Sequence, residues 1–178
     1  MESSGDDPLT SGLAAGDERA FSALYDQFGQ RLYRAALGML GRRQDAEDTV
    51  QEVFVAILQS RRRLTDVQDF TAYLFTALRR AAGRCAARRA RAPALSESTV
   101  NEATATPALR DDRSQYSERL DRAMLALPAE QREVIALKID GELSFAQIAQ
   151  VVGVSINTAA SRYRYALEKL RNSMGEGR

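Results

Sequence analysis

Apolar residues recur at every third or fourth position through much of the first half of the chain, which is the pattern of amphipathic α-helices. This pattern predicts a first helix from Asp17 to Gly41, a second that opens at Asp45, and a third that begins at Phe70. The acids at the start of the second helix suit the positive end of the helix dipole. The buried stripes are expected to be Phe21, Leu24, Tyr25, Phe28, Leu32, Ala36 and Leu40; Val50, Val53, Phe54, Ile57 and Leu58; and Phe70, Tyr73, Leu74, Ala77, Leu78 and Ala81. Three such helices could share one core.

Two stretches in this half lack the helical pattern. Residues 1–17 are acidic and rich in glycine and serine, and they are predicted to form a flexible tail. The stretch Arg61–Asp69 loses the periodicity and is predicted to be a loop. We therefore expect a helical domain over residues 18–91 that follows a short tail.

The composition changes over residues 92–113, which contain Pro93 and Pro107, many small or polar residues and hardly any large apolar ones. Such a composition is typical of a flexible linker. No segment of the chain shows the sustained alternation of a strand. The expected fold class is therefore all-α, with two small helical domains joined by this linker, the second over residues 114–178.

Four short helices are predicted beyond the linker. The first carries Leu120, Met124 and Leu127 on one side, and Pro128 starts the second from a first-turn position. Gly141 helps to end that helix. The remaining two helices form the strongest motif in the chain.

The stretch Phe145–Tyr165 has the spacing of a helix-turn-helix. Ser144 and Gln147 form a capping box for its first helix, Gly153 makes the turn, and Ser155 caps the second helix. The inner stripe of that second helix is expected to be Ala159, Tyr163, Ala166, Leu167 and Leu170.

A helix at this place in the motif can enter the major groove of DNA and present side chains to base edges. The candidates for base contacts lie on one outer face: Asn157, Ser161 and Arg164. The neighbouring row is suited to phosphate contacts: Thr158, Arg162 and Lys169. The alternative interpretation is a small amphipathic hairpin with a solvated polar face.

Composition excludes several kinds of chemistry. With one cysteine, Cys85, and no histidine, the chain can form neither an internal disulfide nor a His/Cys zinc site, and it lacks a histidine acid–base catalyst. No phosphate-cradling glycine loop, metal-ligand cluster or nucleophile–base pair is visible, so we expect neither enzymatic activity nor a cofactor. Without a membrane-length apolar run or a signal pattern, the chain is predicted to be soluble and cytoplasmic.

Charge is clustered although the formal net charge is only +1. Residues 1–18 hold five acids and no basic residue, whereas residues 79–91 hold six arginines and no acid. Like charges on one helix repel each other, and a polyanion would relieve that repulsion. The run therefore indicates a nucleic-acid contact, with a solvated basic tail as the alternative.

The residues now resemble a known family, the extracytoplasmic-function sigma factors of bacterial RNA polymerase. Their promoter-binding C-terminal domain is similar to LPAEQREVIALKIDGELSFAQIAQVVGVSINTAASRYRYALEKLR (residues 127–171). Their N-terminal domain is similar to FSALYDQFGQRLYRAALGMLGRRQDAEDTVQEVFVAIL (residues 21–58) with FTAYLFTALRRAAGRCAARRAR (residues 70–91). The combination of a Leu-Pro start, a helix-turn-helix and an upstream Asp-Ala-Glu-Asp helix is specific to this family.

The resemblance implies a factor that binds core RNA polymerase, directs it to promoters and helps to open the −10 element. The C-terminal domain would bind the −35 element and the polymerase β flap. The helix from Asp45 would bind the β′ clamp through Asp45, Asp48, Gln51, Glu52 and Phe54. An unstacked base of the −10 element would be held by aromatic and arginine side chains. The −10 candidates are Arg61, Arg62, Arg63, Tyr73, Arg79, Arg80 and Arg84. An anti-sigma factor is a further implied partner.

Some residues depart from the family pattern. The family usually has Trp in place of Tyr73, Asn and Asp in place of Arg80 and Arg84, and Val-Lys in place of Ala159–Ala160. The −35 sequence preference is therefore expected to be unusual. Two other functions stay open at this point: an ordinary helix-turn-helix regulator, and a sigma-mimicking decoy that binds a sigma-regulating protein.

Overall fold

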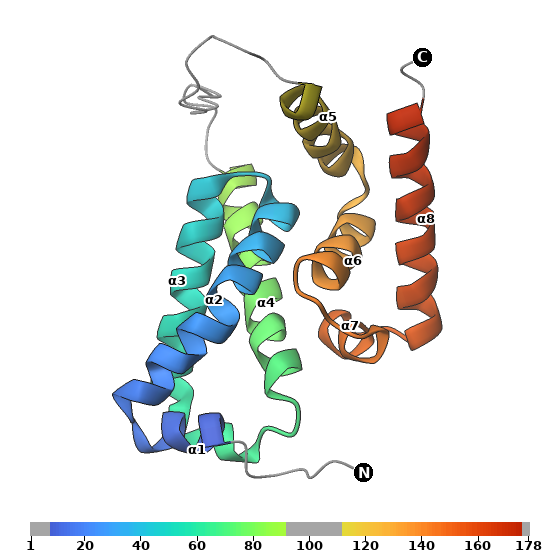
Figure 1. Ribbon diagram of the computed structural model, residues 1–178. Helices are drawn as coiled ribbons and strands as arrows, with labels where there is room; N and C mark the ends of the chain where they lie inside the picture. Colours follow the sequence, from blue (N-terminus) through green and yellow to red (C-terminus); the bar gives the residue numbers. More distant parts are fainter. Residues whose placement is uncertain (1–7, 92–111, 176–178) are drawn as a thin grey trace.

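Every regular element in residues 8–91 and 112–175, the ranges that the computed structural model describes, is helical (Figure 1). The N-terminal half consists of α1 (Pro8–Ala15), α2 (Glu18–Leu40), α3 (Arg43–Ser60), the 3₁₀ helix η1 (Arg61–Asp66) and α4 (Phe70–Arg91). The C-terminal half consists of α5 (Asp112–Ala126), α6 (Ala129–Ile139), α7 (Phe145–Val152) and α8 (Ile156–Gly175). The prediction of an all-α fold with two small helical domains, the second a helix-turn-helix, is confirmed.

Side chains and glycines mark the ends of these helices where the sequence predicted them. Gly41 ends α2 with φ of 73°, in the left-handed region, and its N–H donates to the Leu37 carbonyl at 2.7 Å. Gly153 ends α7 with the same φ of 73°. At the start of α7, the Gln147 N–H donates to the Ser144 hydroxyl, and the Gln147 side chain accepts from the Ser144 N–H at 3.0 Å. The capping box is therefore present in full.

Residues 8–15 form α1, so the prediction of a flexible tail over residues 1–17 is wrong for this part; residues 1–7 lie outside the described residues. α1 packs against η1, and Leu13 and Leu64 are completely buried. The loop predicted over Arg61–Asp69 therefore contains a helical turn. Both elements escape a search for periodicity because each is short and buries only one or two side chains.

The boundary between the halves also differs in detail from the prediction. Most of the predicted linker, residues 92–111, lies outside the described residues. Its last two residues, Asp112 and Arg113, belong to α5, so the helical part of the second half begins earlier than predicted. Pro128 precedes α6 as its N-cap instead of occupying the first turn.

Three residues predicted for buried stripes are exposed instead: Tyr25, Leu58 and Leu120, at 64%, 44% and 36%. The Tyr25 ring lies against the Phe54 ring, with the centroids 5.5 Å apart, and leaves its other face to solvent. Phe75, which the stripe omitted, is completely buried. Its position depends on the other half of the chain, which the periodicity of one helix does not report.

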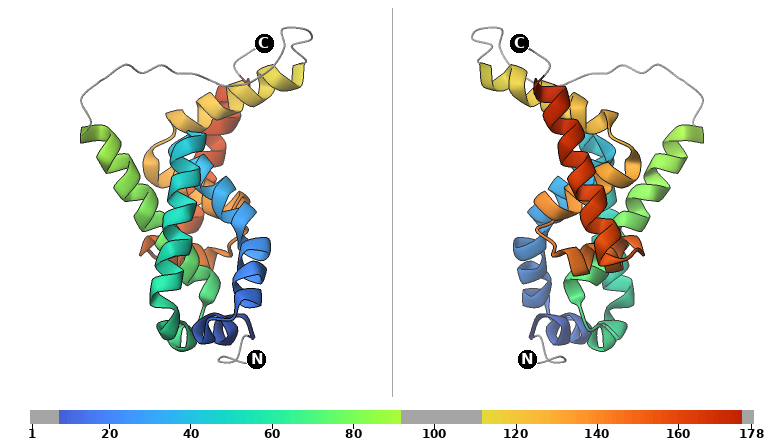
Figure 2. Two further views of the ribbon diagram at one scale, coloured as in Figure 1. Left: turned by 90° about the vertical axis from the view of Figure 1, so that its left-hand side faces the viewer. Right: turned by 90° about the vertical axis from the view of Figure 1, so that its right-hand side faces the viewer.

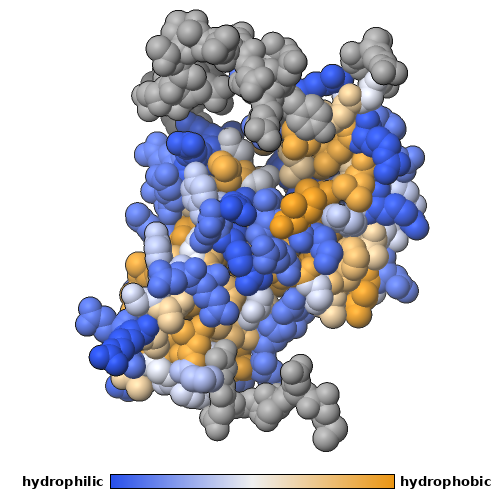
Figure 3. Space-filling model, viewed as in Figure 1, coloured by the Kyte–Doolittle hydropathy of each residue, from blue (hydrophilic) through white to orange (hydrophobic). Residues whose placement is uncertain are grey.

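The two halves pack directly on each other. α2 contacts α6, α4 contacts α7, and one cluster of buried apolar side chains continues from the N-terminal helices into α6 and α7. Figures 1 and 2 show the C-terminal helices alongside α2 and α4. A second, smaller cluster joins α5, α6 and α8, and hydrophobic side chains gather over this part of the surface in Figure 3. α6 therefore belongs to both cores.

Replacing Ser144 with Ala should lower the stability of the chain by about 1 kcal/mol, because the N–H of Gln147 would lose its capping acceptor. We expect a fall of roughly 2–4 °C in the thermal midpoint, measured by circular dichroism. The control is Ser22→Ala, since Ser22 is exposed on α2. An equal midpoint for both variants would contradict a structural role of the capping box.

Candidate nucleic-acid interface

A groove of about 830 Å³ lies between α3, η1 and α4. It brings together six of the seven residues predicted for the −10 element: Arg61, Arg62, Arg63, Tyr73, Arg80 and Arg84. Its apolar wall is formed by Val53, Ala56, Leu58, Ala77 and Ala81. An apolar wall with one aromatic ring and several guanidinium groups at its rim can accept a flat base and its phosphates.

The Tyr73 ring has a fixed position in this groove. Its hydroxyl lies 3.3 Å from the Ser60 hydroxyl, which in turn donates to the Ala56 carbonyl at 2.7 Å. Because the only hydroxyl proton of Ser60 is used on Ala56, the Tyr73 hydroxyl is the donor to Ser60. The half-buried ring is thereby held with its polar end against the junction of α3 and η1.

Arg84 lies at the rim of the groove and pairs with Glu52 across α3 and α4. Its guanidinium donates to the Glu52 carboxylate through Nη2 at 2.6 Å and Nε at 3.1 Å. The pair joins a residue predicted for polymerase binding to one predicted for DNA binding. Because both side chains are at least one-third exposed, the pair contributes at most about 1 kcal/mol and can be exchanged for another partner.

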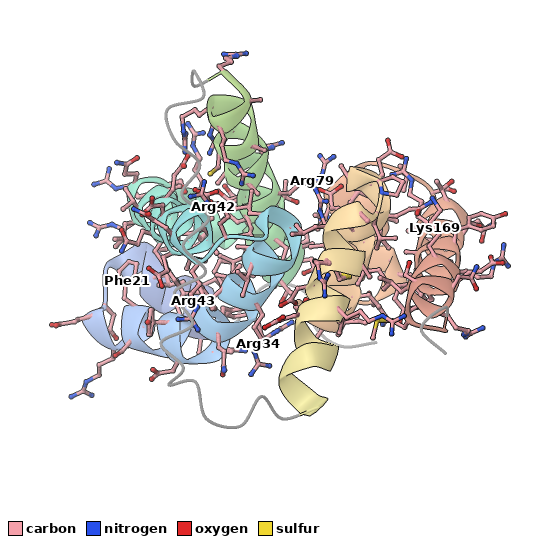
Figure 4. All side chains as sticks on the ribbon, turned by 90° about the horizontal axis from the view of Figure 1, so that it is seen from above. Phe21, Arg34, Arg42, Arg43, Arg79 and Lys169 are labelled. Carbon is pink, nitrogen blue, oxygen red and sulfur yellow. The ribbon has the colours of Figure 1, made fainter. Side chains whose placement is uncertain are left out.

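The structure does not bring Arg79 into the groove. Arg79 points from α4 toward the C-terminal helices (Figure 4), and its Nε lies 2.6 Å from the Glu133 carboxylate on α6. Burial raises the pKa of the Glu133 carboxyl, while Arg79 acts to lower it. Arg89 pairs with Asp45 at 3.3 Å. Acids of the same chain thus relieve part of the repulsion within the arginine run, which weakens repulsion as an argument for a polyanion.

The polymerase-binding candidates occupy three sides of α3. Asp45 and Glu52 face α4 through their arginine partners, and Phe54 faces Tyr25 on α2. Asp48 and Gln51 are exposed on the outer side. Two apolar residues of α3, Val55 and Leu58, are also exposed, at 50% and 44%. The sequence interpretation missed Val55 and assigned Leu58 to the core. The signal that could have identified Val55 is that it is an apolar residue outside the predicted buried stripe of its helix.

The helix-turn-helix of α7 and α8 holds the candidates for the −35 element at its surface. Asn157 and Arg164 are exposed on the outer face of α8, with Ser161 partly buried between them. Thr158 is tied into the start of the helix, where its N–H donates to the Ser155 hydroxyl at 3.1 Å. The predicted base-contact residues therefore share a side that is directed away from the core.

The residues predicted for phosphate contacts differ from one another in their surroundings. Lys169 is exposed, whereas Nη2 of Arg162 lies 2.7 Å from the Glu130 carboxylate of α6. The exposed Tyr165 was not predicted, and the Arg164 guanidinium lies over its ring at 5.4 Å from the centroid. Its position next to the reading face was the signal that could have identified it.

Two negative findings apply to the described parts of the chain. No helix there combines the length and the hydropathy needed to cross a membrane. Within the same residues, no group of three or more His, Cys, Asp or Glu side chains is placed to hold a metal ion.

Family models match both halves of the chain. The model of sigma-70 region 2 matches residues 24–92, and that of sigma-70 region 4 matches residues 117–170. The curated relatives include the ECF RNA polymerase sigma factor SigL of Mycobacterium tuberculosis (strain ATCC 25618 / H37Rv), 32% identical over 93% of this chain and 95% of that protein. They also include the ECF RNA polymerase sigma factor SigK of Mycobacterium bovis (strain BCG / Pasteur 1173P2), 27% identical over 94% of this chain and 92% of that protein.

Solved structures share the fold. CnrH in complex with the cytosolic domain of CnrY superposes with a TM-score of 0.71 at 24% identity, over 96% of this chain and 97% of that one. The sigma factor RpoE from Bartonella quintana, in complex with the anti-sigma factor NepR, gives a TM-score of 0.68 at 24% identity, over 90% and 99%. The matches to regions 2 and 4 and the identity to SigL favour neither of the two alternative functions, an ordinary helix-turn-helix regulator and a sigma-mimicking decoy. The chain belongs to the extracytoplasmic-function sigma factors, which bind core RNA polymerase and direct it to promoter DNA.

Proposed function

We propose that this sigma factor holds an unstacked base of the −10 element in the groove between α3, η1 and α4. The observation that carries the proposal is the convergence of six predicted residues, from two elements (η1 and α4), on that one groove. Tyr73 supplies a ring for stacking, while Arg61, Arg62, Arg63 and Arg80 supply cations for the phosphates. Arg84 joins them when it exchanges Glu52 for a phosphate. Arg79 has no part in this contact.

The −35 element is assigned to the outer face of α8. Asn157, Ser161 and Arg164 contact base edges, and Thr158 and Lys169 contact phosphates. Arg162 reaches a phosphate only after it leaves Glu130. Support for this assignment comes from the exposure of Asn157, Thr158, Arg164 and Lys169 on a helix that follows a tight glycine turn.

Core polymerase is assigned to the outer side of α3, where the β′ clamp contacts Asp48 and Gln51 with the exposed Val55 beside them. The second half contacts the β flap. An anti-sigma factor is a further proposed partner, because the solved RpoE neighbour is held by one. The factor works in the cytoplasm, where bacterial polymerase transcribes, and it supplies binding without catalysis or a cofactor.

The groove is tested by Arg80→Ala in reconstituted holoenzyme. Opening of the −10 element, followed by the fluorescence of a 2-aminopurine base in the non-template strand, should slow by about tenfold or more, since a hydrogen bond to a charged group contributes about 1.5–3 kcal/mol.

The matched control is Arg88→Ala, which removes the same charge from an exposed position of α4 outside the groove. Arg88→Ala should change the opening rate by no more than about twofold. Equal slowing by both variants would mean that the arginines act through general charge, and the groove would lose its assigned role.

A further inference from the structure

Two tyrosines of α8 lie on opposite sides of the helix. Tyr163 faces inward, where its ring meets the Phe145 ring of α7 edge-on with the centroids 5.6 Å apart. It packs against both clusters of buried apolar side chains. Tyr165 is about 200° further round the helix, is 51% exposed and belongs to neither of the clusters that the described residues form. Core packing therefore accounts for Tyr163 and leaves Tyr165 unexplained.

Tyr165 continues the row of side chains that is directed away from the core. Asn157, Ser161 and Tyr165 follow one another at intervals of four residues, so successive members are neighbours on the helix surface. Arg164 precedes Tyr165 by one residue, which is about 1.5 Å along the helix axis. The Tyr165 ring therefore extends the predicted base-contact face at the same position along α8 as Arg164.

The two side chains are in contact with each other. The Arg164 guanidinium lies over the Tyr165 ring, 5.4 Å from its centroid. Adjacent residues of a helix point about 100° apart, so the Arg164 side chain bends toward the ring. Arg164 makes no ion pair with any residue in the described part of the chain, whereas Arg162 is held by Glu130 at 2.7 Å. Because the ring covers only the face of the guanidinium, the N–H donors at its edge stay available to an acceptor.

A guanidinium beside an aromatic ring matches the chemistry of two neighbouring base pairs. In the major groove guanine offers two acceptors to an arginine, and thymine is the base that carries a methyl group there, which an aromatic side chain can contact. The rise of about 1.5 Å between Arg164 and Tyr165 is smaller than the spacing of about 3.4 Å between base pairs. Both side chains can therefore reach the same step of the DNA from one position of α8.

We propose that Tyr165 is a further specificity-determining residue for the −35 element. Its ring contacts the methyl group of a thymine at the base pair next to the guanine that Arg164 contacts, and it holds the Arg164 guanidinium in position for that guanine. The inference rests on the proposed assignment of α8 to the −35 element. It adds that the preferences at two neighbouring base pairs depend on each other, because one pair of stacked side chains contacts both.

Removal of a single methyl group from the DNA tests the thymine contact. A promoter duplex is first selected by the holoenzyme from a pool with random bases in the −35 element, and each thymine of that element is then replaced in turn by uracil. Holoenzyme with the unsubstituted chain should lose about fourfold in affinity at one position, which is the effect expected for one buried methyl group. Tyr165→Ala should bind the thymine and uracil duplexes equally well.

Tyr165→Phe is the matched control, because it keeps the ring and removes only the hydroxyl. It should retain the fourfold loss at the same thymine. Tyr165→Ala should also reduce the preference for guanine at the adjacent base pair by about two- to fivefold, the effect of losing one exposed contact between a cation and a ring, while Tyr165→Phe leaves that preference unchanged. Since alanine favours a helix and Tyr165 is exposed, α8 itself should stay folded in both variants.

Two results would overturn the inference: the same uracil profile for Tyr165→Ala and the unsubstituted chain, or equal losses for Tyr165→Phe and Tyr165→Ala on every duplex, which would place the hydroxyl on a phosphate. Arg164→Ala and Lys169→Ala separate this failure from that of the proposed function. If they still weaken binding while Tyr165→Ala is silent, only the role of Tyr165 is lost. If neither affects binding to any duplex, α8 is not the helix that contacts the −35 element.

Discussion

Asp48→Arg should lower the affinity of the chain for core RNA polymerase by about 100-fold. Asp48 is exposed on the outer side of α3, where an acid is proposed to face a basic part of the polymerase clamp. Placing like charges together in an interface costs several kcal/mol, and each 1.4 kcal/mol is about tenfold in affinity. The affinity is measured by titrating labelled chain with core enzyme, with helicity followed by circular dichroism.

Glu47→Arg is the matched control for this change. Glu47 is the adjacent acid of α3 and is exposed, but it lies about 100° around the helix from Asp48. Reversal at Glu52 would be a poor test, because it would also release Arg84 at the rim of the groove. If the two variants bind core enzyme equally well, the outer side of α3 is not the polymerase contact.

Arg164→Ala should relax the preference of the holoenzyme at one or two base pairs of the −35 element. Arginine can donate two hydrogen bonds to guanine, and a good pair of this kind contributes roughly 1–3 kcal/mol of discrimination, or about 5- to 150-fold. Arg164 is exposed on the same face of α8 as Asn157. The loss is measured as binding to a panel of promoter duplexes that differ at single positions.

Lys169→Ala should behave differently on the same panel. Lys169 is exposed in the neighbouring row of α8, so its loss should weaken binding to every duplex alike and reduce the salt dependence by about one unit. The two classes of contact then separate in one experiment at several salt concentrations. Uniform losses for both variants would show that Arg164 contacts no base and that α8 lies in the major groove of the DNA in another orientation.

Local chemistry made the helix-turn-helix predictable. The start of α7 depends on Ser144 and Gln147, and its end on Gly153, and all of these act within a few residues of one another. The inner side of α8 followed in the same way, with Ala159 and Ala166 completely buried. Interactions between residues that are close in the sequence can be predicted from the sequence alone.

The groove could be predicted only in part. Its residues come from separate elements, and their selection rested on a family resemblance instead of on spacing. Arg79 and Arg80 are adjacent in the sequence, yet a rotation of about 100° directs one to Glu133 and the other to the groove. Which side of α4 meets the second half depends on how the halves pack, and no local pattern contains that information.

The close packing of the two halves could not be predicted from the sequence either. Gly38 and Gly141 carry no mark in the sequence that separates them from other glycines, although each accommodates an atom from a distant segment. The burial of the Phe75 ring could not be predicted from its own helix, because its partners, Arg31 and Gly141, lie far away along the chain. Contacts over such separations follow from the assembled fold.

The helix α1 gives the groove a support that the family match does not include. Gly16, directly after α1, has φ of 82°, and a Cβ there would lie 3.0 Å from the Arg61 guanidinium. The region 2 model begins at residue 24, so the matched segment leaves out α1, although α1 packs in the folded domain. A fragment cut at residue 24 would lack the helix on which η1 rests, and would misplace the first arginine of the groove while keeping every matched residue.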